Sequence, residues 1–243
     1  MASLINSPIH SAGPTRVWPP LRVHECFEIL ADRQPQAPAV ILGDGTLTYA
    51  ELDQKANALA HALLARELSA EEPVGVLTER SGSLPIAFLA ILKAGGAYVP
   101  MGADLPAQRL ANMAAQSSMR CLIALDGLEP PVELLAALGA SPAILRPEEL
   151  NGESHRPNQP GKPTDLVAIL FGPGAQPKGI LLQHDACINL AYGHINAHCI
   201  TPDDRLLMAA APGFILGFRE LCVPLLAGAA SVPVSRALLD DPA

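Results

Sequence analysis

Short apolar runs alternate with longer segments whose apolar residues recur every three or four positions along most of this chain. The runs have the length of strands that are buried on both faces, whereas the longer segments have the period of amphipathic helices. Strands that alternate with helices usually pair in parallel and carry the helices on the faces of their sheet. The pattern therefore predicts an α/β fold with a layered, mostly parallel sheet and helices on both faces.

The boundaries of the expected elements follow from this periodicity and from turn residues. Predicted strands cover residues 39–42, 73–77, 97–100, 120–125, 166–171, 206–211 and 228–234, and predicted helices cover residues 23–31, 52–64, 84–94, 108–116, 130–138, 184–197 and 218–226. We expect Thr48 and Glu51 to form a capping box and Gly95 to end a helix. Pro224 is expected to break the last helix or to start a new register there.

The unbroken alternation predicts one continuous unit from residue 21 to residue 243, with two lobes as the alternative. Residues 1–20 have no periodicity and are rich in Ser, Pro and Gly, so we expect a flexible leader. Residues 151–164 are polar and contain three prolines, which makes this loop the weakest seam of the unit.

Composition and charge narrow the classes of function. The chain is 49% hydrophobic with 16% charged residues, and its net charge of -8 comes without a basic block. The negative net charge and the lack of a basic block exclude a general binder of nucleic acids or of anionic membranes. In addition, no apolar run reaches the length of a membrane span. The five cysteines form no C-x-x-C pair, so free thiols in a reducing, cytoplasmic location are expected. His194 and His198 have the spacing of a metal-binding helix face but no third ligand beside them.

Candidate chemistry lies directly after the predicted strand 166–171. The chain breaks there into a glycine-rich stretch that ends in Lys178 and Gly179 and also contains Gly172 and Gly174. Glycines allow close approach of the backbone, successive N–H groups can cradle an anion, and the lysine supplies charge. The stretch does not fit the Walker pattern. It is either a phosphate-binding loop or a surface turn with a solvated lysine.

Several motifs resemble the adenylation domains of nonribosomal peptide synthetases, which are adenylate-forming enzymes. They are LTYAEL at residues 47–52, LKAGGAYVP at residues 92–100, PKG at residues 177–179, and a fourth motif in which Phe214 and Glu220 match. This resemblance covers nearly all of the chain after the leader. It implies the N-terminal portion of the adenylate-forming (ANL-type) fold, with Gly172, Gly174, Lys178 and Gly179 in the phosphate loop.

Departures from the family pattern fall on residues that would contact the ligand. Hydroxyl residues of the family loop, which donate hydrogen bonds to phosphate oxygens, are replaced in this chain by Leu170, Phe171, Pro173 and Gly174. The second glycine of the family loop is replaced by Ala175. In the substrate pocket, which the resemblance assigns to Phe214, Ile215 and Arg219, Ile215 replaces the aspartate that pairs with an α-ammonium group. An isoleucine cannot compensate a buried cation.

The resemblance also implies that an adenine-contacting strand, a ribose-binding aspartate and a lobe with the catalytic lysine lie beyond Ala243, because no stretch here matches them. We therefore expect a degenerate, truncated adenylation-like domain, a pseudoenzyme without catalytic residues of its own that acts as a structural or interaction element. The first alternative is one half of a split AMP-forming ligase that a partner chain completes. The second is a binding module that retains a nucleotide or acyl pocket, although the altered loop weighs against ATP as its ligand.

Ligands and partners follow from the same reasoning. No cofactor is expected, and ATP with Mg²⁺ would bind only if the phosphate loop still functions. The expected partner is a protein of a biosynthetic assembly line, or a second copy that pairs with an exposed edge near residues 228–234.

Overall fold

The chain folds into two sheets with helices packed between them. The computed structural model describes residues 20–43, 45–139, 142–147, 152–173 and 178–234. One sheet has six strands in the order β6-β5-β3-β4-β7-β8, and the other has four in the order β2-β1-β10-β9. All pairings are parallel except β1 with β2 and β7 with β8. The predicted α/β fold with mostly parallel strands and helices is confirmed.

The elements have the following bounds. The strands are β1 (Pro38–Ile41), β2 (Thr46–Thr48), β3 (Pro73–Thr78), β4 (Ala97–Gly102), β5 (Cys121–Ala124), β6 (Ala143–Leu145), β7 (Leu166–Phe171), β8 (Gly179–Gln183), β9 (Arg205–Met208) and β10 (Ala230–Pro233). The helices are α1 (Val23–Arg33), α2 (Tyr49–Leu64), α3 (Leu84–Lys93), α4 (Ala107–Ser117), α5 (Val132–Ala137), α6 (His184–His198) and α7 (Ile215–Ala227).

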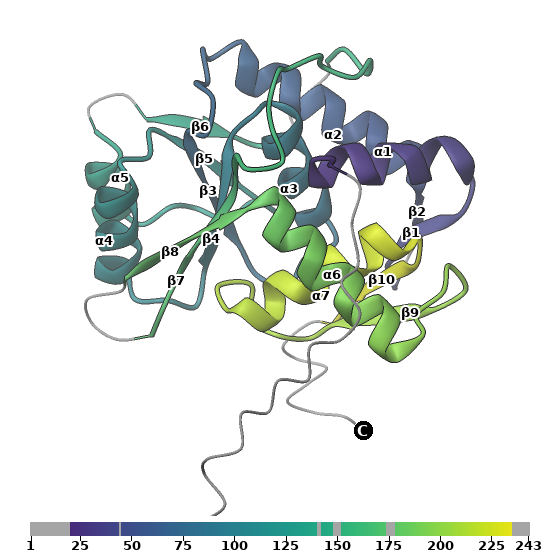
Figure 1. The fold of residues 1–243 in the computed structure, drawn as a ribbon. Coiled ribbons are helices and arrows are strands. Elements are labelled where there is room, and N and C mark those ends of the chain that lie inside the picture. Colours follow the sequence, from purple (N-terminus) through teal and green to yellow (C-terminus); the bar gives the residue numbers. More distant parts are fainter. Residues whose placement is uncertain (1–19, 44, 140–141, 148–151, 174–177, 235–243) are drawn as a thin grey trace, which may run out of the picture.

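Two hydrophobic cores cover the two faces of the six-stranded sheet. The larger core joins α1, α2, α3, α6 and α7 to both sheets, so these helices form the middle layer (Figure 1). Every residue of α3 is buried, as expected for a helix that is apolar around its whole circumference. The smaller core packs α4 and α5 against the opposite face of the six-stranded sheet.

Local signals in the sequence set several boundaries. The Thr48 side chain accepts a hydrogen bond from the Glu51 N–H at 3.2 Å, and the Glu51 carboxylate accepts one from the Thr48 N–H at 2.8 Å. This capping box starts α2, as predicted. Gly95 follows α3 with a φ of +82°, a conformation that glycine adopts without strain.

Four elements differ from the prediction. The sequence pattern does not predict the short strands β2 and β6, nor β8, whose apolar residues Ile180 and Leu181 follow the glycine-rich stretch directly and are exposed. Helix α7 begins at Ile215 and continues through Pro224, so the predicted break is wrong. The proline removes one helical hydrogen bond, and burial of residues 221–226 on this helix offsets that loss.

The expectation of an open edge near residues 228–234 is also wrong. Strand β10 lies between β1 and β9, and its residues pair with β9 from Ala230 with Arg205 to Pro233 with Met208. On the other side, Ser231 pairs with Val40 of β1. With neighbours on both sides, β10 has no free edge for a second copy.

The remaining expectations about organisation concern the termini, the seam and the cysteines. Residues 1–19 and 235–243 lie outside the described part, and the seam at 151–164 stays a prediction. In the described residues, no helix has the length and apolar character that crossing a membrane requires. The free thiols of Cys26, Cys121, Cys187 and Cys222 are buried, and that of Cys199 is exposed.

Candidate functional site

The glycine-rich turn joins β7 to β8 at the carboxyl end of a parallel strand. The Gly172 N–H donates to the Lys178 carbonyl at 3.1 Å, and Phe171 pairs with Gly179 in the ladder, so the two ends of the turn are held together. Strands β3, β4 and β7 run parallel, and ligands of such sheets bind at the carboxyl ends of the strands. Gly174 lies outside the described residues.

The described glycines of the turn have different surroundings. A Cβ atom at Gly179 would lie 3.1 Å from the Ile169 side chain, so packing of the hairpin favours glycine there. At Gly172 the nearest atom to such a Cβ would be the Lys178 carbonyl oxygen at 3.9 Å, which leaves room for a side chain. The Lys178 side chain is exposed. Of these two glycines, only Gly179 is favoured by the contacts around it.

Arg109 from α4 fixes the beginning of the turn. Its Nη2 atom donates to the Gly172 carbonyl at 2.8 Å. Residues 106–110 continue the second family-like motif and include Arg109, although the motif alone assigns this residue no role in a site. The contact brings a guanidinium group to the glycine turn, where Lys178 was the only cation expected.

A cavity of about 520 Å³ lies beside this contact. Its described lining consists of Leu105, Pro106, Gln108, Arg109, Asn112, Pro173 and Phe214. The cavity thus joins the start of α4 to the glycine turn and to the start of α7. Arg109 is the one charged residue in this described lining, so the cavity suits an apolar or anionic group better than an ammonium group.

Two of the three expected substrate-pocket residues lie together at the start of α7. Phe214 is the N-cap and Ile215 the first helical residue, and their exposed fractions are 52% and 53%. Of the three, Phe214 alone belongs to the described lining of the cavity. The structure therefore brings Phe214 to the glycine turn and leaves Ile215 open to solvent beside it.

The connection between β9 and α7 keeps the side chains of Phe214 and Ile215 exposed to solvent. The Glu220 carboxylate accepts hydrogen bonds from the N–H groups of Ala209 and Ala210, both at 2.8 Å. Arg80 Nε donates to the Ala209 carbonyl at 2.5 Å. A Cβ at Gly217 would lie only 2.4 Å from the Ala211 carbonyl oxygen, so this position requires glycine. Glu220, a residue that matches the family motif, thus has a structural role here.

Arg219 is directed differently from Phe214. It is half-buried and does not belong to the described lining of the cavity. Burial, and then the charge of Arg219, lowers the pKa of His194 on α6. The Arg219 guanidinium therefore lies close enough to α6 for its charge to act on His194.

His184 has a structural role at the start of α6. It is buried at the start of α6, and its Nδ1 accepts a hydrogen bond from the Val23 N–H at 3.2 Å. Burial, followed by the charge of Arg22, lowers the pKa of His184 to about 4. The imidazole is therefore neutral near pH 7 and links α6 to α1.

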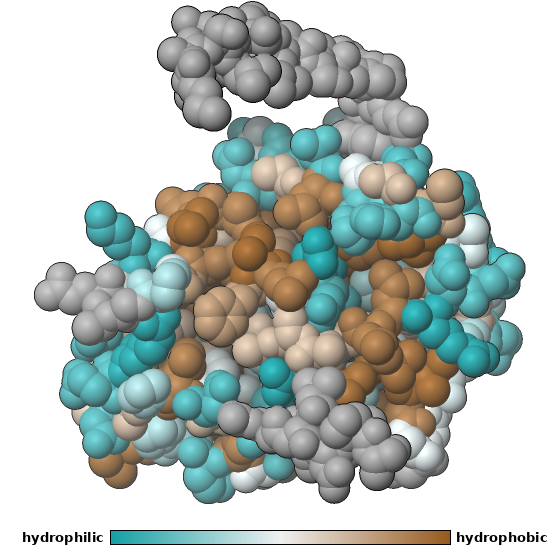
Figure 2. Space-filling view, turned by 90° about the horizontal axis from the view of Figure 1, so that it is seen from below, coloured by the Kyte–Doolittle hydropathy of each residue, from teal (hydrophilic) through white to brown (hydrophobic). Residues whose placement is uncertain are grey.

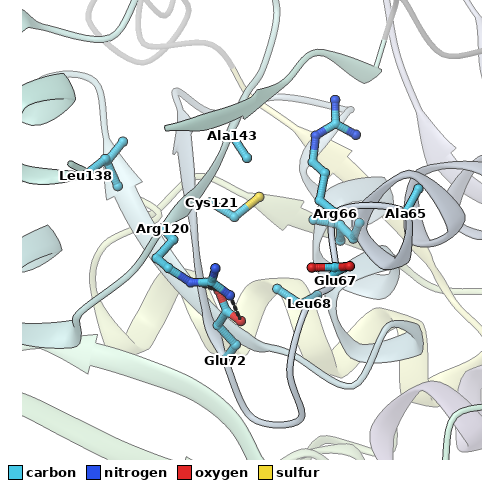
Figure 3. A pocket seen from close by; sticks show the side chains of 10 residues that line it. Ala65, Arg66, Glu67, Leu68, Glu72, Arg120, Cys121, Leu138 and Ala143 are labelled. Atoms are coloured by element: carbon cyan, nitrogen blue, oxygen red, sulfur yellow. Dashed lines mark hydrogen bonds and ion pairs between the residues drawn. The ribbon is translucent and has the colours of Figure 1, made fainter. Parts of the chain in front are cut away.

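A second cavity, of about 480 Å³, lies at the amino ends of β5 and β6, far along the strands from the glycine turn (Figure 3). Arg120 donates to both carboxylate oxygens of Glu72, at 3.1 and 2.8 Å. Burial raises the pKa of the Cys121 thiol in this cavity to about 11, which keeps it protonated and unreactive. The described lining of this cavity therefore offers no activated nucleophile.

Comparison with known proteins places this fold and these motifs in one family. The AMP-binding enzyme family matches residues 27–243. A linear gramicidin synthase of Brevibacillus parabrevis is 36% identical over 222 residues, which are 90% of this chain and 3% of that protein. Tyrocidine synthase 1 of the same organism is 33% identical, again over 90% of this chain and over 20% of its own length.

Solved structures agree with this assignment. The nonribosomal peptide synthetase FmoA3 in its α-methyl-L-serine-AMP bound form superposes with a TM-score of 0.83 at 27% identity, over 92% of this chain and 25% of its own. The N-terminal subdomain of Klebsiella oxytoca NpsA, in complex with 3-hydroxybenzoyl-AMSN, gives 0.76 at 25% identity over 90% and 56%.

The chain thus spans a fifth or less of the two curated relatives and about a quarter of FmoA3. Within that span, the match covers both sheets, the glycine turn and the start of α7. The chain belongs to the AMP-binding enzyme family, and its relatives are the adenylation domains of nonribosomal peptide synthetases.

Proposed function

We propose that this polypeptide is a degenerate adenylation-like element that does not form an acyl-adenylate by itself and serves a structural or interaction role in a peptide-synthetase assembly line. The observation that carries this proposal is Ile215, which stands at the position of the family's ammonium-binding aspartate and is exposed beside an apolar cavity. No carboxylate in the described lining of that cavity replaces it.

The phosphate side of the reaction supports the same proposal. Attack of a carboxylate on the α-phosphate needs charge neutralisation where negative charge develops. Pro173 has no N–H to donate, and the guanidinium of Arg109 already donates to the Gly172 carbonyl. Lys178 is left as an exposed point charge at the end of the turn.

Calorimetric titration of the chain with MgATP tests the proposal, together with ATP–pyrophosphate exchange in the presence of a panel of carboxylic acids. We expect neither binding nor exchange. The double variant Pro173→Ser, Ala175→Gly restores two of the family's loop residues and, if these two positions are the defect, gains nucleotide binding. Exchange catalysed by the unaltered chain alone would overturn the proposal.

The second candidate function is one half of an AMP-forming ligase that a partner protein completes. Exposed apolar side chains favour it: Leu207 on β9 and Phe214, Ile215 and Leu216 at the start of α7 are each at least 44% exposed. These elements lie on the underside of the molecule as drawn in Figure 1, and that face shows several hydrophobic areas (Figure 2).

A substrate without an α-amino group would fit Ile215 in this second case. The NpsA subdomain carries a 3-hydroxybenzoyl group, which has no such amine. The test mixes the chain with neighbouring gene products and measures exchange with hydroxybenzoates and with α-amino acids. Exchange with the aryl acids alone supports the split ligase, and silence with every partner rejects it.

A further inference from the structure

Two histidines and a glutamate converge on the side of α2. His61 comes from the last turn of that helix, and Glu153 and His155 come from the segment 152–165 that leads into β7. Their ligand atoms all lie within 4.8 Å of one another. The Glu153 Oε2 atom lies 3.4 Å from His155 Nδ1 and 4.0 Å from His61 Nδ1.

The tautomer of His61 is fixed by its surroundings. Its Nε2 atom lies 3.0 Å from the backbone carbonyl oxygen of His155. A carbonyl only accepts hydrogen bonds, so Nε2 carries the hydrogen and Nδ1 presents its lone pair toward Glu153. Histidine ligands of metals characteristically donate their second ring N–H to a carbonyl or carboxylate in this way.

The backbone around Glu153 and His155 is held by contacts that do not involve these three side chains. Asn57 Nδ2 on α2 donates to the Ser154 carbonyl at 2.7 Å. The next residue after His155, Arg156, bonds Asp53 of the same helix through Nε at 2.9 Å. The segment is thus already seated on α2, and an ion need only orient the side chains of His155 and Glu153.

We propose that His61, Glu153 and His155 bind a divalent transition-metal ion of the zinc, copper or nickel class. Zinc–nitrogen and zinc–oxygen bonds of about 2.0–2.2 Å place the ligand atoms of a tetrahedral site about 3.3 Å apart, close to the observed 3.4 and 4.0 Å. Imidazole nitrogens select these metals over Mg²⁺ and Ca²⁺, and water completes the fourth position. Because the segment 152–165 feeds β7 and the glycine turn, the ion would fasten that segment to α2.

The other histidine pair provides a matched control. His194 and His198 on α6 have ring centroids 4.2 Å apart, closer than the 4.4 Å between His61 and His155. Among the described residues no third ligand joins them in a cluster of this kind. Each of the two sites therefore has two imidazole rings close together. The site at His61 differs because it also has a carboxylate, that of Glu153, and a fixed tautomer of His61.

Zinc titration by calorimetry at pH 7.5 tests the proposal, with the triple variant His194→Ala, His198→Ala, Cys199→Ser as the background, which lacks the histidine pair of α6 and the exposed thiol next to it. We expect one ion per chain. His61→Ala and His155→Ala should weaken binding at least tenfold, and Glu153→Gln should weaken it several-fold. Affinity should fall as the pH is lowered to 5.5, because protonated imidazole cannot bind the ion.

A second measurement guards against variants that unfold. Copper(II) bound to the background protein should show hyperfine coupling to two imidazole nitrogens by electron paramagnetic resonance, and His155→Ala, whose side chain is mostly exposed, should leave one. Failure of the background protein to bind zinc at 1:1 stoichiometry would overturn the proposal. Zinc binding unaffected by His61→Ala and His155→Ala would overturn it equally.

Discussion

Two segments flank β7: the segment 152–165 before the strand and the glycine turn after it. The first matches no family motif but makes several contacts with distant residues, whereas the second carries a motif and its described residues make few such contacts. The segment 152–165 before the strand matches no family motif, yet Arg156, Asn57 and His61 tie it to α2. The turn after the strand carries the PKG motif, and its described residues are held by the Gly172–Lys178 bond and by Arg109. A motif thus marks where a site belongs in the chain, whereas groups distant in sequence decide how firmly a segment is fixed.

A cluster of charged side chains, in part buried, holds the segment 152–165 against the helices. Lys93, at the end of α3, is 1% exposed and contacts the carboxylates of Glu28 and Asp53. Asp53 also binds Arg156, and a hydrogen bond to the Asp32 carboxylate raises the pKa of Arg156. The segment therefore depends on a cluster of ion pairs contributed by three helices.

The largest expected effect comes from removing the centre of that cluster. Lys93→Met removes the buried cation between two carboxylates and leaves only Arg156 beside them, and breaking a buried ion pair costs about 3–5 kcal/mol of unfolding free energy. Urea denaturation measures it. Lys55→Met, on the exposed side of α2, should change stability by less than about 0.5 kcal/mol. Equal effects of the two variants would contradict a role for the cluster.

The end of the segment responds to pH through His184. The backbone N–H of His184 donates to the Asp165 carbonyl, and burial lowers the pKa of the imidazole to about 4. Between pH 6.5 and 4 the unfolded chain binds a proton that the folded protein rejects, so stability falls as the pH falls through this window. His184 alone would account for up to about 3 kcal/mol. In His184→Gln the stability should be lower at pH 7 and should change less between pH 6.5 and 4.

The carboxylates of the unaltered protein are also present in His184→Gln and titrate in both proteins. The difference between the two curves of stability against pH therefore reports the contribution of His184. Burial also lowers the pKa of His24, whose ring centroid lies 5.8 Å from that of His184. Parallel curves for the two proteins would show that His184 does not reject the proton.

The next effect distinguishes two glycines beside the second segment. A Cβ at Gly217 would meet the Ala211 carbonyl, whereas at Gly213 nothing lies within 4 Å. Gly217→Ala should therefore cost about 1–3 kcal/mol by overpacking and should displace the start of α7. Gly213→Ala should stay within about 0.5 kcal/mol. Thermal unfolding of the pair measures the difference, and a cost at Gly213 alone would refute this packing.

The smallest effect concerns the glycine turn itself. Arg109→Ala removes the donor to the Gly172 carbonyl and should cost about 1 kcal/mol. Hydrogen exchange of the β8 amides should accelerate, because the hairpin loses its contact with α4. Gln108→Ala, which removes an exposed bond to Asn112 on the same helix, is the control. Unchanged exchange in Arg109→Ala would mean that the hairpin does not depend on this contact.

Much of the fold could be predicted because its signals are local. The capping residues Thr48 and Glu51, the apolar run of α3 from Leu84 to Leu92 and the buried run of β7 all lie within single elements. Strand β8 could not be predicted in this way, because most of its residues are exposed and no buried face alternates with them. Its extended conformation depends on the ladder that it forms with β7.

The candidate site was less predictable. The position of the turn and of Phe214 followed from the motifs, but the contact of Arg109 with Gly172 joins residues 63 positions apart. The helical period places Asp53 outside the apolar face of α2, yet Asp53 is buried because Lys93 supplies a cation from α3. Pairings between elements of this kind leave no periodic trace in the sequence.

The position of β10 has a consequence for how the protein is made. Strand β1 pairs with β10 through Val40 and Ser231, so its partner is synthesised about 190 residues later. At ribosomal rates of about 5–20 residues per second, that interval lasts roughly 10–40 s. Throughout it, β1 has only β2 beside it and offers an unpaired edge to other chains. Translation speed, rather than the stability of the finished fold, therefore sets how long the nascent chain is exposed to misassembly.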